Sequence, residues 1–281
     1  GVTAVLVPNN PQVTLQAGKH RFSLYKDGPV DAVHLSALFK RVPVAASGTL
    51  KLNLYFVSLG YMSAANSTSS TRFVNAIEHL KNVYAQVGVS LEIEGRYDIG
   101  GAEGQQYTNL DLANGEDDER QKLLRLSAMN PDSSAVNIFF VQDIDASDYS
   151  GSFDVLGIAG GIPGPPLFQG VNGAGVVVNM SDFNSFWGSD YEISHLYGEV
   201  IAHEVGHQLG LFHTSEQSGD VHDQLSDTVT CTNDQNGDGF VDGNECWANG
   251  SAKNLMFWQA TGAVTLSNQQ GGVMRANPGV F

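Results

Sequence analysis

Three histidines in the last third of the chain stand at a spacing that suits a metal ion. His203, His207 and His213 belong to the run His-Glu-Val-Gly-His-Gln-Leu-Gly-Leu-Phe-His. On a helix, His203 and His207 would leave the same face one turn apart, because residues four apart share a face. Gly210 can adopt backbone angles that other residues avoid, so the chain can turn there and bring His213 back. Three protein ligands leave a fourth position open, as in a catalytic zinc site.

Glu204 directly follows the first of these histidines. There a carboxylate can reach a water molecule at the metal without binding the metal itself, which is the place of a general base. Apolar residues around the motif recur at spacings of three and four, which predicts a helix over about 190 to 212. The competing interpretation is a helix whose histidines only cap or pack. We expect zinc at His203, His207 and His213, with Glu204 as the catalytic residue.

A second group of oxygen-bearing side chains lies between residues 234 and 245, which read Asp-Gln-Asn-Gly-Asp-Gly-Phe-Val-Asp-Gly-Asn-Glu. Positions one, three, five, nine and twelve are Asp234, Asn236, Asp238, Asp242 and Glu245. A glycine, Gly239, stands at position six, and the carbonyl of Phe240 at position seven would add a ligand. This is the pattern of an EF-hand calcium loop. The alternative is an acidic loop that is simply solvated.

Two cysteines, Cys231 and Cys246, flank this acidic loop almost directly. An even pair at this position predicts a local disulfide, an oxidising compartment and a secreted protein. Two free thiols are the alternative, since spacing alone proves no bond. No cysteine precedes Cys231, so a pro-segment cysteine cannot hold the zinc in a latent form.

Composition and charge limit the partners. The 281 residues are 42% hydrophobic, enough for a sizeable core, and the formal net charge is −16. Such an acidic chain argues against nucleic acid or an anionic membrane as a partner, because both need basic patches. No apolar run reaches the length of a membrane-spanning helix. We expect a monomer.

The elements that must position these residues follow from hydrophobic periodicity. Residues 1–46 are expected to be a β-rich segment, with strands near 13–15 and 20–25, left from a pre-domain or serving as a pro-segment. Residues 47–213 are expected to form the N-terminal catalytic subdomain, and residues 214–281 the C-terminal one. Within the catalytic subdomain, the strands are predicted at 50–59, 89–93, 136–141 and 175–179, and the helices at about 73–87 and after the acidic run 116–119. The run 136–141 is apolar on both faces and is predicted to be central. This alternation predicts an α/β fold.

On these motifs, the chain resembles the metzincin zinc peptidases, and among them the pappalysin-like subfamily, over residues 48–281. The matching pieces are residues 156–159 with Pro163, 175–178, 203–214, 226–228, 255–256 and 266–275. The resemblance implies a twisted, mostly parallel sheet with backing helices and a smaller, irregular C-terminal subdomain. It implies a methionine turn at Met256 beneath the zinc. It also implies a strand edge above the cleft, which we assign to about 174–179, where substrate backbone would pair.

The chain departs from the resemblance in two places. Many relatives carry a tyrosine two residues after the turn methionine, whereas Trp258 stands here and can only donate one indole N–H. Val229 replaces a proline that often follows Asp-Thr. The role of a tyrosine at the metal is therefore in doubt for this chain.

The predicted function is zinc-dependent endopeptidase, acting on a protein or peptide substrate, with Zn²⁺ and Ca²⁺ as cofactors. The first alternative is a secreted calcium-binding adhesion or matrix module with a vestigial zinc site. The second is a zinc hydrolase that acts on something other than peptides. The other histidines, among them His79 and His195, are expected to be surface or core residues, and His222 is the best of them for a role in the cleft.

Overall fold

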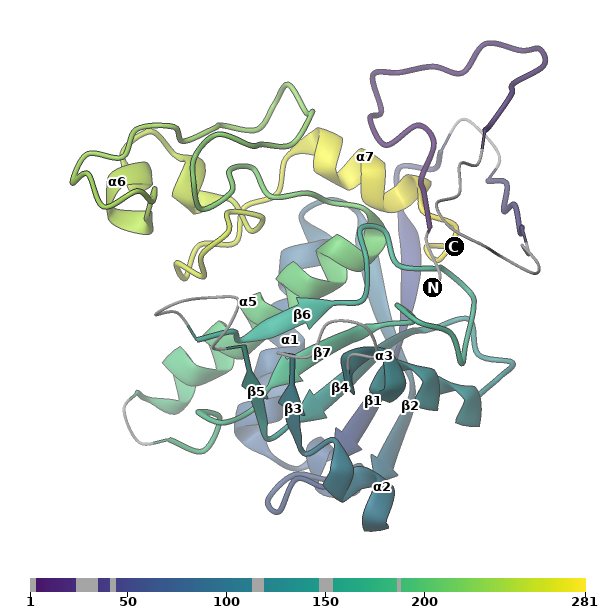
Figure 1. The fold of residues 1–281 in the computed structure, drawn as a ribbon, viewed down its shortest axis with the longest axis vertical. Helices are drawn as coiled ribbons and strands as arrows, with labels where there is room; N and C mark the ends of the chain where they lie inside the picture. The colour runs from purple at the N-terminus through teal and green to yellow at the C-terminus, as the bar shows by residue number, and fades with distance from the viewer. Residues whose placement is uncertain (1–3, 24–34, 41–43, 113–118, 147–153, 186–187) are drawn as a thin grey trace.

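A five-stranded sheet forms the frame of the molecule (Figure 1). The computed structural model describes residues 4–23, 35–40, 44–112, 119–146, 154–185 and 188–281. The strand order is β2-β1-β4-β7-β6, and every neighbouring pair is parallel except β6 with β7. The strands are β1 (Gly48–Val57), β2 (Val89–Ile99), β4 (Val136–Val141), β6 (Gly157–Ala159) and β7 (Val176–Asn179). Every residue of β4 is buried and β4 is the middle strand, so the predicted central strand is confirmed.

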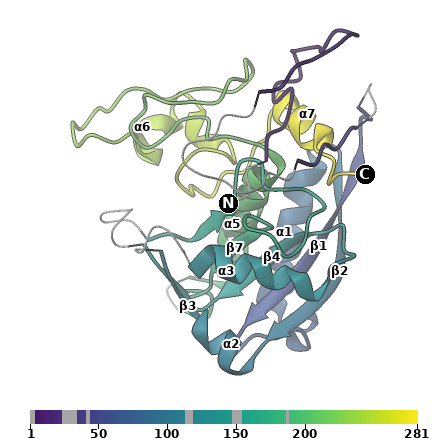
Figure 2. The same cartoon turned by 45° about the vertical axis from the view of Figure 1, so that its right-hand side comes forward.

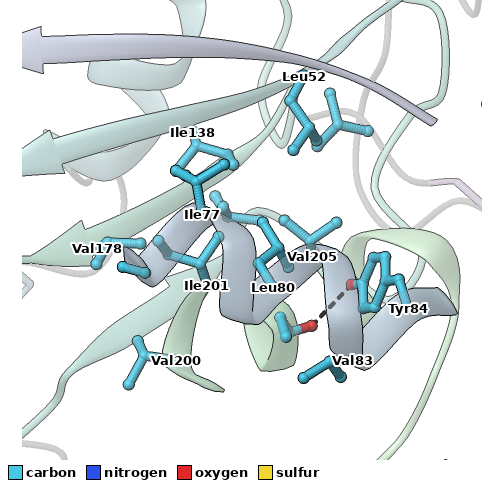
Figure 3. Packing of buried hydrophobic residues seen from close by; sticks show 14 of the residues in the cluster. Leu52, Ile77, Leu80, Val83, Tyr84, Ile138, Val178, Val200, Ile201 and Val205 are labelled. Carbon is cyan, nitrogen blue, oxygen red and sulfur yellow. Dashed lines mark hydrogen bonds between the residues drawn. The ribbon is translucent and has the colours of Figure 1, made fainter. Parts of the chain in front are cut away.

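Two long helices, α1 (Thr71–Ala85) and α5 (Asp190–Leu209), cover one face of the sheet. Figure 3 shows their apolar side chains packed together beneath the strands. The Tyr84 hydroxyl of α1 donates to the carbonyl of Ala202 in α5 at 2.8 Å. The helices approach each other closely at Gly198, where a Cβ would lie 2.7 Å from the carbonyl oxygen of Ala76. The sheet and α1 thereby fix the position of α5, which carries two of the three predicted metal ligands.

The opposite face of the sheet carries a second core. It is covered by α3 (Glu119–Arg125) and by a small parallel pair of strands, β3 (Asn109–Asp111) and β5 (Asp143–Asp145). The short helix α2 (Gly101–Gln106) precedes β3, and the 3-10 helix η2 (Leu126–Met129) follows α3. Helices on one face and a mixed layer on the other make an α/β fold, as predicted. Of the acidic run before α3, residues 116–118 lie outside the described residues.

The C-terminal part has little regular structure and lies at one end of the molecule, far from α2 (Figure 2). It contains α6 (Gly243–Trp247), the 3-10 helix η3 (Ser251–Lys253) and α7 (Asn268–Ala276). Helix α7 begins at a capping box between Ser267 and Gln270, and it corresponds to the predicted closing helix. Among the described helices, none is long and apolar enough to cross a membrane.

The expected β-rich N-terminal segment is not formed in the residues that the structure describes. Residues 4–23, 35–40 and 44–47 contain no strand. Val13 and Leu15 are about half exposed, and Phe22 is exposed as well. A strand needs a neighbour to satisfy its backbone groups, and alternating apolar residues alone do not supply one. The prediction for residues 24 and 25 lies outside the described residues.

The assignment of the sheet edge to residues 174–179 was wrong. Strand β7 pairs with β4 on one side and with β6 on the other, so it lies inside the sheet. The edge on this side of the sheet is β6, only three residues long, in a stretch rich in glycine and proline. Such a stretch looks like a turn in the sequence, and its pairing with β7 depends on residues almost twenty positions away.

Candidate active site

The local sequence determines where α5 begins and ends. The helix starts with a capping box, in which the Ser189 hydroxyl and the Glu192 carboxylate each accept from the other's backbone N–H. It ends at Gly210, which has the left-handed angles φ 110° and ψ 13°. These angles favour glycine and reverse the chain. The reversal carries His213 back to the helix face that bears His203 and His207.

The three histidines converge on one point. Each pair of Nε2 atoms among His203, His207 and His213 is 3.1 Å apart. Each Nδ1 faces an oxygen: the carbonyl of Leu255 at 2.8 Å, the carbonyl of Leu211 at 2.7 Å and the carboxylate of Glu216 at 2.8 Å, respectively. A carbonyl or carboxylate oxygen accepts, so the ring proton is assigned to Nδ1 and the Nε2 lone pairs point inward.

Three inward lone pairs repel one another unless a cation lies between them. Nitrogen atoms at this separation can all reach one ion at the usual Zn–N distance of about 2.0–2.1 Å. Among the described residues, this is the only group of three or more His, Cys, Asp or Glu side chains whose ligand atoms gather within 4.8 Å. The donor set therefore fits zinc, with outer oxygens that fix each ring.

Burial keeps the imidazoles of His203 and His207 neutral and able to bind a metal. It lowers the pKa of His203 to about 3, with a further contribution from His213, and the Leu255 carbonyl opposes the shift. Burial, followed by the charges of the other two histidines, also holds the pKa of His207 well below its ordinary value. A proton would occupy the nitrogen that a metal needs, so neutral rings favour metal binding near pH 7.

Glu204 is buried between α5 and the edge strand β6. A Cβ at Gly157 would lie 2.6 Å from Cγ of Glu204, so this close approach requires glycine. Burial raises the pKa of Glu204 to about 8, and a hydrogen bond from the backbone of Ala159 opposes that shift. The carboxylate is therefore enclosed next to the first histidine and held by the edge strand, which is a suitable position for proton transfer.

Met256 packs against α5 at Gly206, the residue before His207. It is fully buried, and its sulfur is 2.9 Å from the position of a Cβ on Gly206, on the underside of α5. The carbonyl of Met256 accepts the backbone N–H of Thr214 at 2.8 Å, and its neighbour Leu255 holds His203. This turn therefore supports both ends of the ligand set.

Trp258 turns its polar atom toward the acidic loop. Its indole Nε1 donates to the carbonyl of Val241 at 2.6 Å. Val241 is buried, and its N–H donates to the carbonyl of Gln217. Trp258 therefore connects the methionine turn to the acidic loop, and its donor does not take the place of the tyrosine hydroxyl of many relatives.

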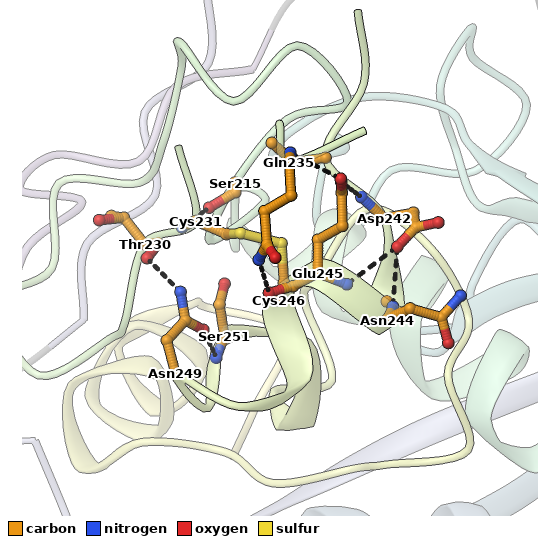
Figure 4. The surroundings of a disulfide bond; sticks show 12 residues. Ser215, Thr230, Cys231, Gln235, Asp242, Asn244, Glu245, Cys246, Asn249 and Ser251 are labelled. Atoms are coloured by element: carbon orange, nitrogen blue, oxygen red, sulfur yellow. Dashed lines mark hydrogen bonds between the residues drawn. A yellow bond between two sulfur atoms is a disulfide. The ribbon is translucent and has the colours of Figure 1, made fainter. Parts of the chain in front are cut away.

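Cys231 and Cys246 form a disulfide, as predicted (Figure 4). Both cysteines are buried, and the backbone N–H of Cys231 donates to the Ser215 hydroxyl. The bond closes the acidic loop, residues 231–246, at its base. The hydrogen bond from Cys231 to Ser215 joins the loop to the segment that follows His213.

Inside the disulfide-closed loop, side-chain oxygens accept from nearby backbone N–H groups. The two carboxylate oxygens of Asp234 accept from Gly237 and Gly239, and Glu245 accepts from Gln235, Asn236 and Asp242. Asn236 and Asp238 each accept from the residue two positions later. Asp242 caps α6 with bonds from Asn244 and Glu245. The tight turn expected at position six is present, because Gly239 has φ 91°.

Two residues beside the histidine cluster were not predicted. Glu216 holds His213, and Glu199, one turn before His203, accepts the backbone N–H groups of Thr261 and Gly262 at 3.0 Å. Isolated glutamates look solvated in a sequence, so only the spacing of Glu216 to His213 could have indicated its role.

His222, the expected cleft residue, has a buried Nδ1 with no partner among the described residues. Asp227 accepts from Ser267 and Gln269 at the start of α7.

Three converging imidazoles that leave a coordination position open, beside a carboxylate on α5, define a zinc hydrolase site, and the full motif is that of metzincin peptidases. The chain matches the reprolysin-like metallopeptidase family M12B over residues 70–214, more than half of its length. It belongs to this family and is a zinc metallopeptidase.

Two solved structures are also similar to the chain. One is archaemetzincin from Methanopyrus kandleri, at 16% identity and a TM-score of 0.39, covering 63% of this chain and 82% of that one. The other is metalloproteinase-II from Bacteroides fragilis, at 16% identity and a TM-score of 0.42, covering 84% of this chain and 54% of that one. No curated protein matches the sequence.

Proposed function

We propose that the chain is a secreted zinc endopeptidase in which Glu204 is the general base and His203, His207 and His213 hold the metal. The observation that carries the proposal is the convergence of three Nε2 atoms at 3.1 Å beside α5, the helix that also carries the buried Glu204. Gly210 and Met256 complete the site, the first by turning the chain and the second by supporting α5 from below.

The chemistry is hydrolysis of an amide bond. His203, His207 and His213 would hold a zinc ion, which would lower the pKa of a water molecule and polarise a carbonyl group. The Glu204 carboxylate accepts the proton of the attacking water and then delivers it to the nitrogen of the leaving amine. Its raised pKa suits a group that must both take and give a proton.

The substrate backbone is proposed to lie along β6. This strand is the edge of the sheet, and its residues Gly157 and Ala159 both contact Glu204. An edge strand offers unpaired backbone groups to an extended peptide, which adds as a further strand. A peptide bound in this way would pass directly beside the proposed base, which favours cleavage within a chain.

The subfamily and the calcium site are proposed from the sequence pattern. We assign the chain to the pappalysin-like metzincins on the motifs given above. We further propose that Ca²⁺ binds the loop through Asp234, Asn236, Asp238, Asp242, Glu245 and the carbonyl of Phe240. The left-handed Gly239 and the disulfide support a loop of this shape. The disulfide also supports an extracellular location.

Cleavage of a quenched peptide library tests the function. We expect cleavage inside peptides, loss of activity after chelation, and its return on adding zinc. If no peptide is cleaved by the zinc-loaded protein, the proposal fails and a non-catalytic adhesion module is favoured.

A separate melting experiment tests the calcium assignment. A zinc-restored sample without calcium should melt at a lower temperature than a zinc-restored sample with calcium. Equal melting temperatures would remove the calcium assignment alone.

A further inference from the structure

A hollow of about 340 Å³ lies between α1 and α5. One face of each helix lines it, with residues spaced three or four apart. The lining residues are Asn75, Glu78, His79 and Asn82 from α1, and Tyr191, Ser194 and His195 from α5. None of them belongs to the zinc site, and two of them are histidines from different helices.

The two imidazoles are in contact across the hollow. The ring centroids of His79 and His195 are 4.2 Å apart, compared with 4.6–5.1 Å for the pairs of the zinc cluster. The contact is held by the packing of α1 on α5 at Gly198, where a Cβ would meet the His79 ring at 2.8 Å. Two such rings on rigid helices are already brought together before any ligand binds.

His195 is oriented in the same way as the zinc-site histidines. Its Nδ1 lies 2.8 Å from the carbonyl of Tyr191, one turn earlier, so the ring proton is assigned to Nδ1. Its Nε2 is then a lone pair, with no hydrogen-bond partner among the described residues. An outer oxygen that fixes the tautomer is the usual companion of a metal-binding histidine.

The His79 imidazole is neutral near pH 7. Burial, and then the neighbouring His195, lower the pKa of His79 to about 4. The one carboxylate that lines the hollow, Glu78, is paired with Lys81 at 2.6 Å. A pair of imidazoles in contact in a polar hollow is a donor set for borderline divalent ions such as Zn²⁺, Ni²⁺ and Cu²⁺.

We propose that His79 and His195 form a second binding site for a divalent transition-metal ion, which joins α1 to the active-site helix α5. Two protein nitrogens bind the ion, and water fills the remaining positions. With one ligand fewer than the catalytic cluster, this site binds more weakly. The inference does not depend on peptidase activity.

The test starts from protein that already holds one equivalent of zinc. Ni²⁺ is titrated by calorimetry while the retained zinc is measured, and Cu²⁺ is followed by electron paramagnetic resonance. We expect one further equivalent of Ni²⁺ and a Cu²⁺ signal from nitrogen ligands. His195→Ala should weaken this binding by more than the roughly 10- to 100-fold that losing an outer partner costs. His195 is partly exposed, so this variant should fold, and its peptidase activity should not change.

Two further variants make the assignment specific. His79→Gln should lose the same equivalent, whereas His20→Ala, an exposed histidine near the N-terminus, should keep it. Ni²⁺ should also raise the melting temperature of the unchanged protein more than that of His195→Ala. Absence of a second equivalent overturns the proposal. Binding that survives in both His195→Ala and His79→Gln overturns it as well, because the ion then lies elsewhere.

Discussion

The histidine cluster and the disulfide-closed loop are two polar centres built on opposite principles. In the cluster, a rigid helix and a turn aim three nitrogen lone pairs at one point, and outer oxygens prevent the rings from turning away. In the loop, carboxylate and amide oxygens accept from nearby backbone N–H groups, and a disulfide closes the base. The cluster is assembled for a ligand, whereas the loop is held together by its own backbone.

This difference has a consequence for stability and activity. The cluster should determine activity while contributing little to folding in the absence of metal, because its nitrogens repel one another. The loop should contribute to folding through its disulfide. Around the methionine turn, Trp258 binds Val241 of the loop, and Glu199 of α5 binds the backbone of Thr261 and Gly262.

Removing the disulfide should give the largest loss of stability. The double change Cys231→Ser and Cys246→Ser frees a loop closed over a separation of 15 residues. A loop of about that length corresponds to about 3 kcal/mol of unfolding free energy. Denaturant unfolding measures the loss. Activity at low temperature should remain, and a variant that is inactive while still folded and zinc-loaded would contradict the separation of the two centres.

A side chain at Gly157 should reduce activity without removing zinc. In Gly157→Ala, the new Cβ would lie 2.6 Å from Cγ of Glu204, so the carboxylate must move. A displacement of about 1 Å near the chemistry can lower the rate about 100-fold. Steady-state kinetics and zinc content check this, with Gly60→Ala as the control, since nothing lies within 4 Å of a Cβ there. Unchanged kcat would show that Glu204 tolerates another position.

Loss of the Glu216 carboxylate should weaken zinc binding. In Glu216→Gln, His213 keeps a neutral acceptor in place of a charged one, and the expected loss of zinc affinity is about 10-fold, within the range for outer partners. Competition with a chelator measures the affinity. Glu92→Gln, an exposed glutamate of β2, should change nothing. Equal affinities in all three proteins would mean that Glu216 does not orient His213.

Loss of the Glu199 carboxylate should change stability in a way that depends on pH. Burial raises its pKa from 4.5 to about 7, and the N–H groups of Thr261 and Gly262 oppose the shift. The folded state therefore binds the Glu199 proton more tightly than the unfolded state does. The stability gained from this protonation is fully present below pH 4.5 and is lost as the pH rises through about 7. Glutamine does not titrate, so Glu199→Gln removes this loss. The free energy of unfolding of the variant should rise by about 1–3 kcal/mol relative to that of the unchanged protein as the pH goes from 5 to 8. A constant difference across that range would contradict the assignment.

The same comparison explains what the sequence could and could not predict. The histidine cluster follows from helical spacing and one glycine, and the central strand from an uninterrupted apolar run, so both depend on local pattern. Whether the N-terminal residues form strands, and which strand is the edge, depends on pairing with distant residues, which periodicity does not report. Gly157 and Glu216 matter through single contacts across the fold, so their residue types alone carry no signal.

The central claim is that zinc on the three histidines and the carboxylate of Glu204 together hydrolyse peptide bonds. Measuring zinc content and peptide cleavage on the same sample of Glu204→Gln tests it most directly. The account predicts one zinc per chain, as in the unchanged protein, and a turnover lower by about 10²- to 10⁴-fold, the usual contribution of a general base. Turnover within a few-fold of the unchanged protein at full zinc content would contradict the account.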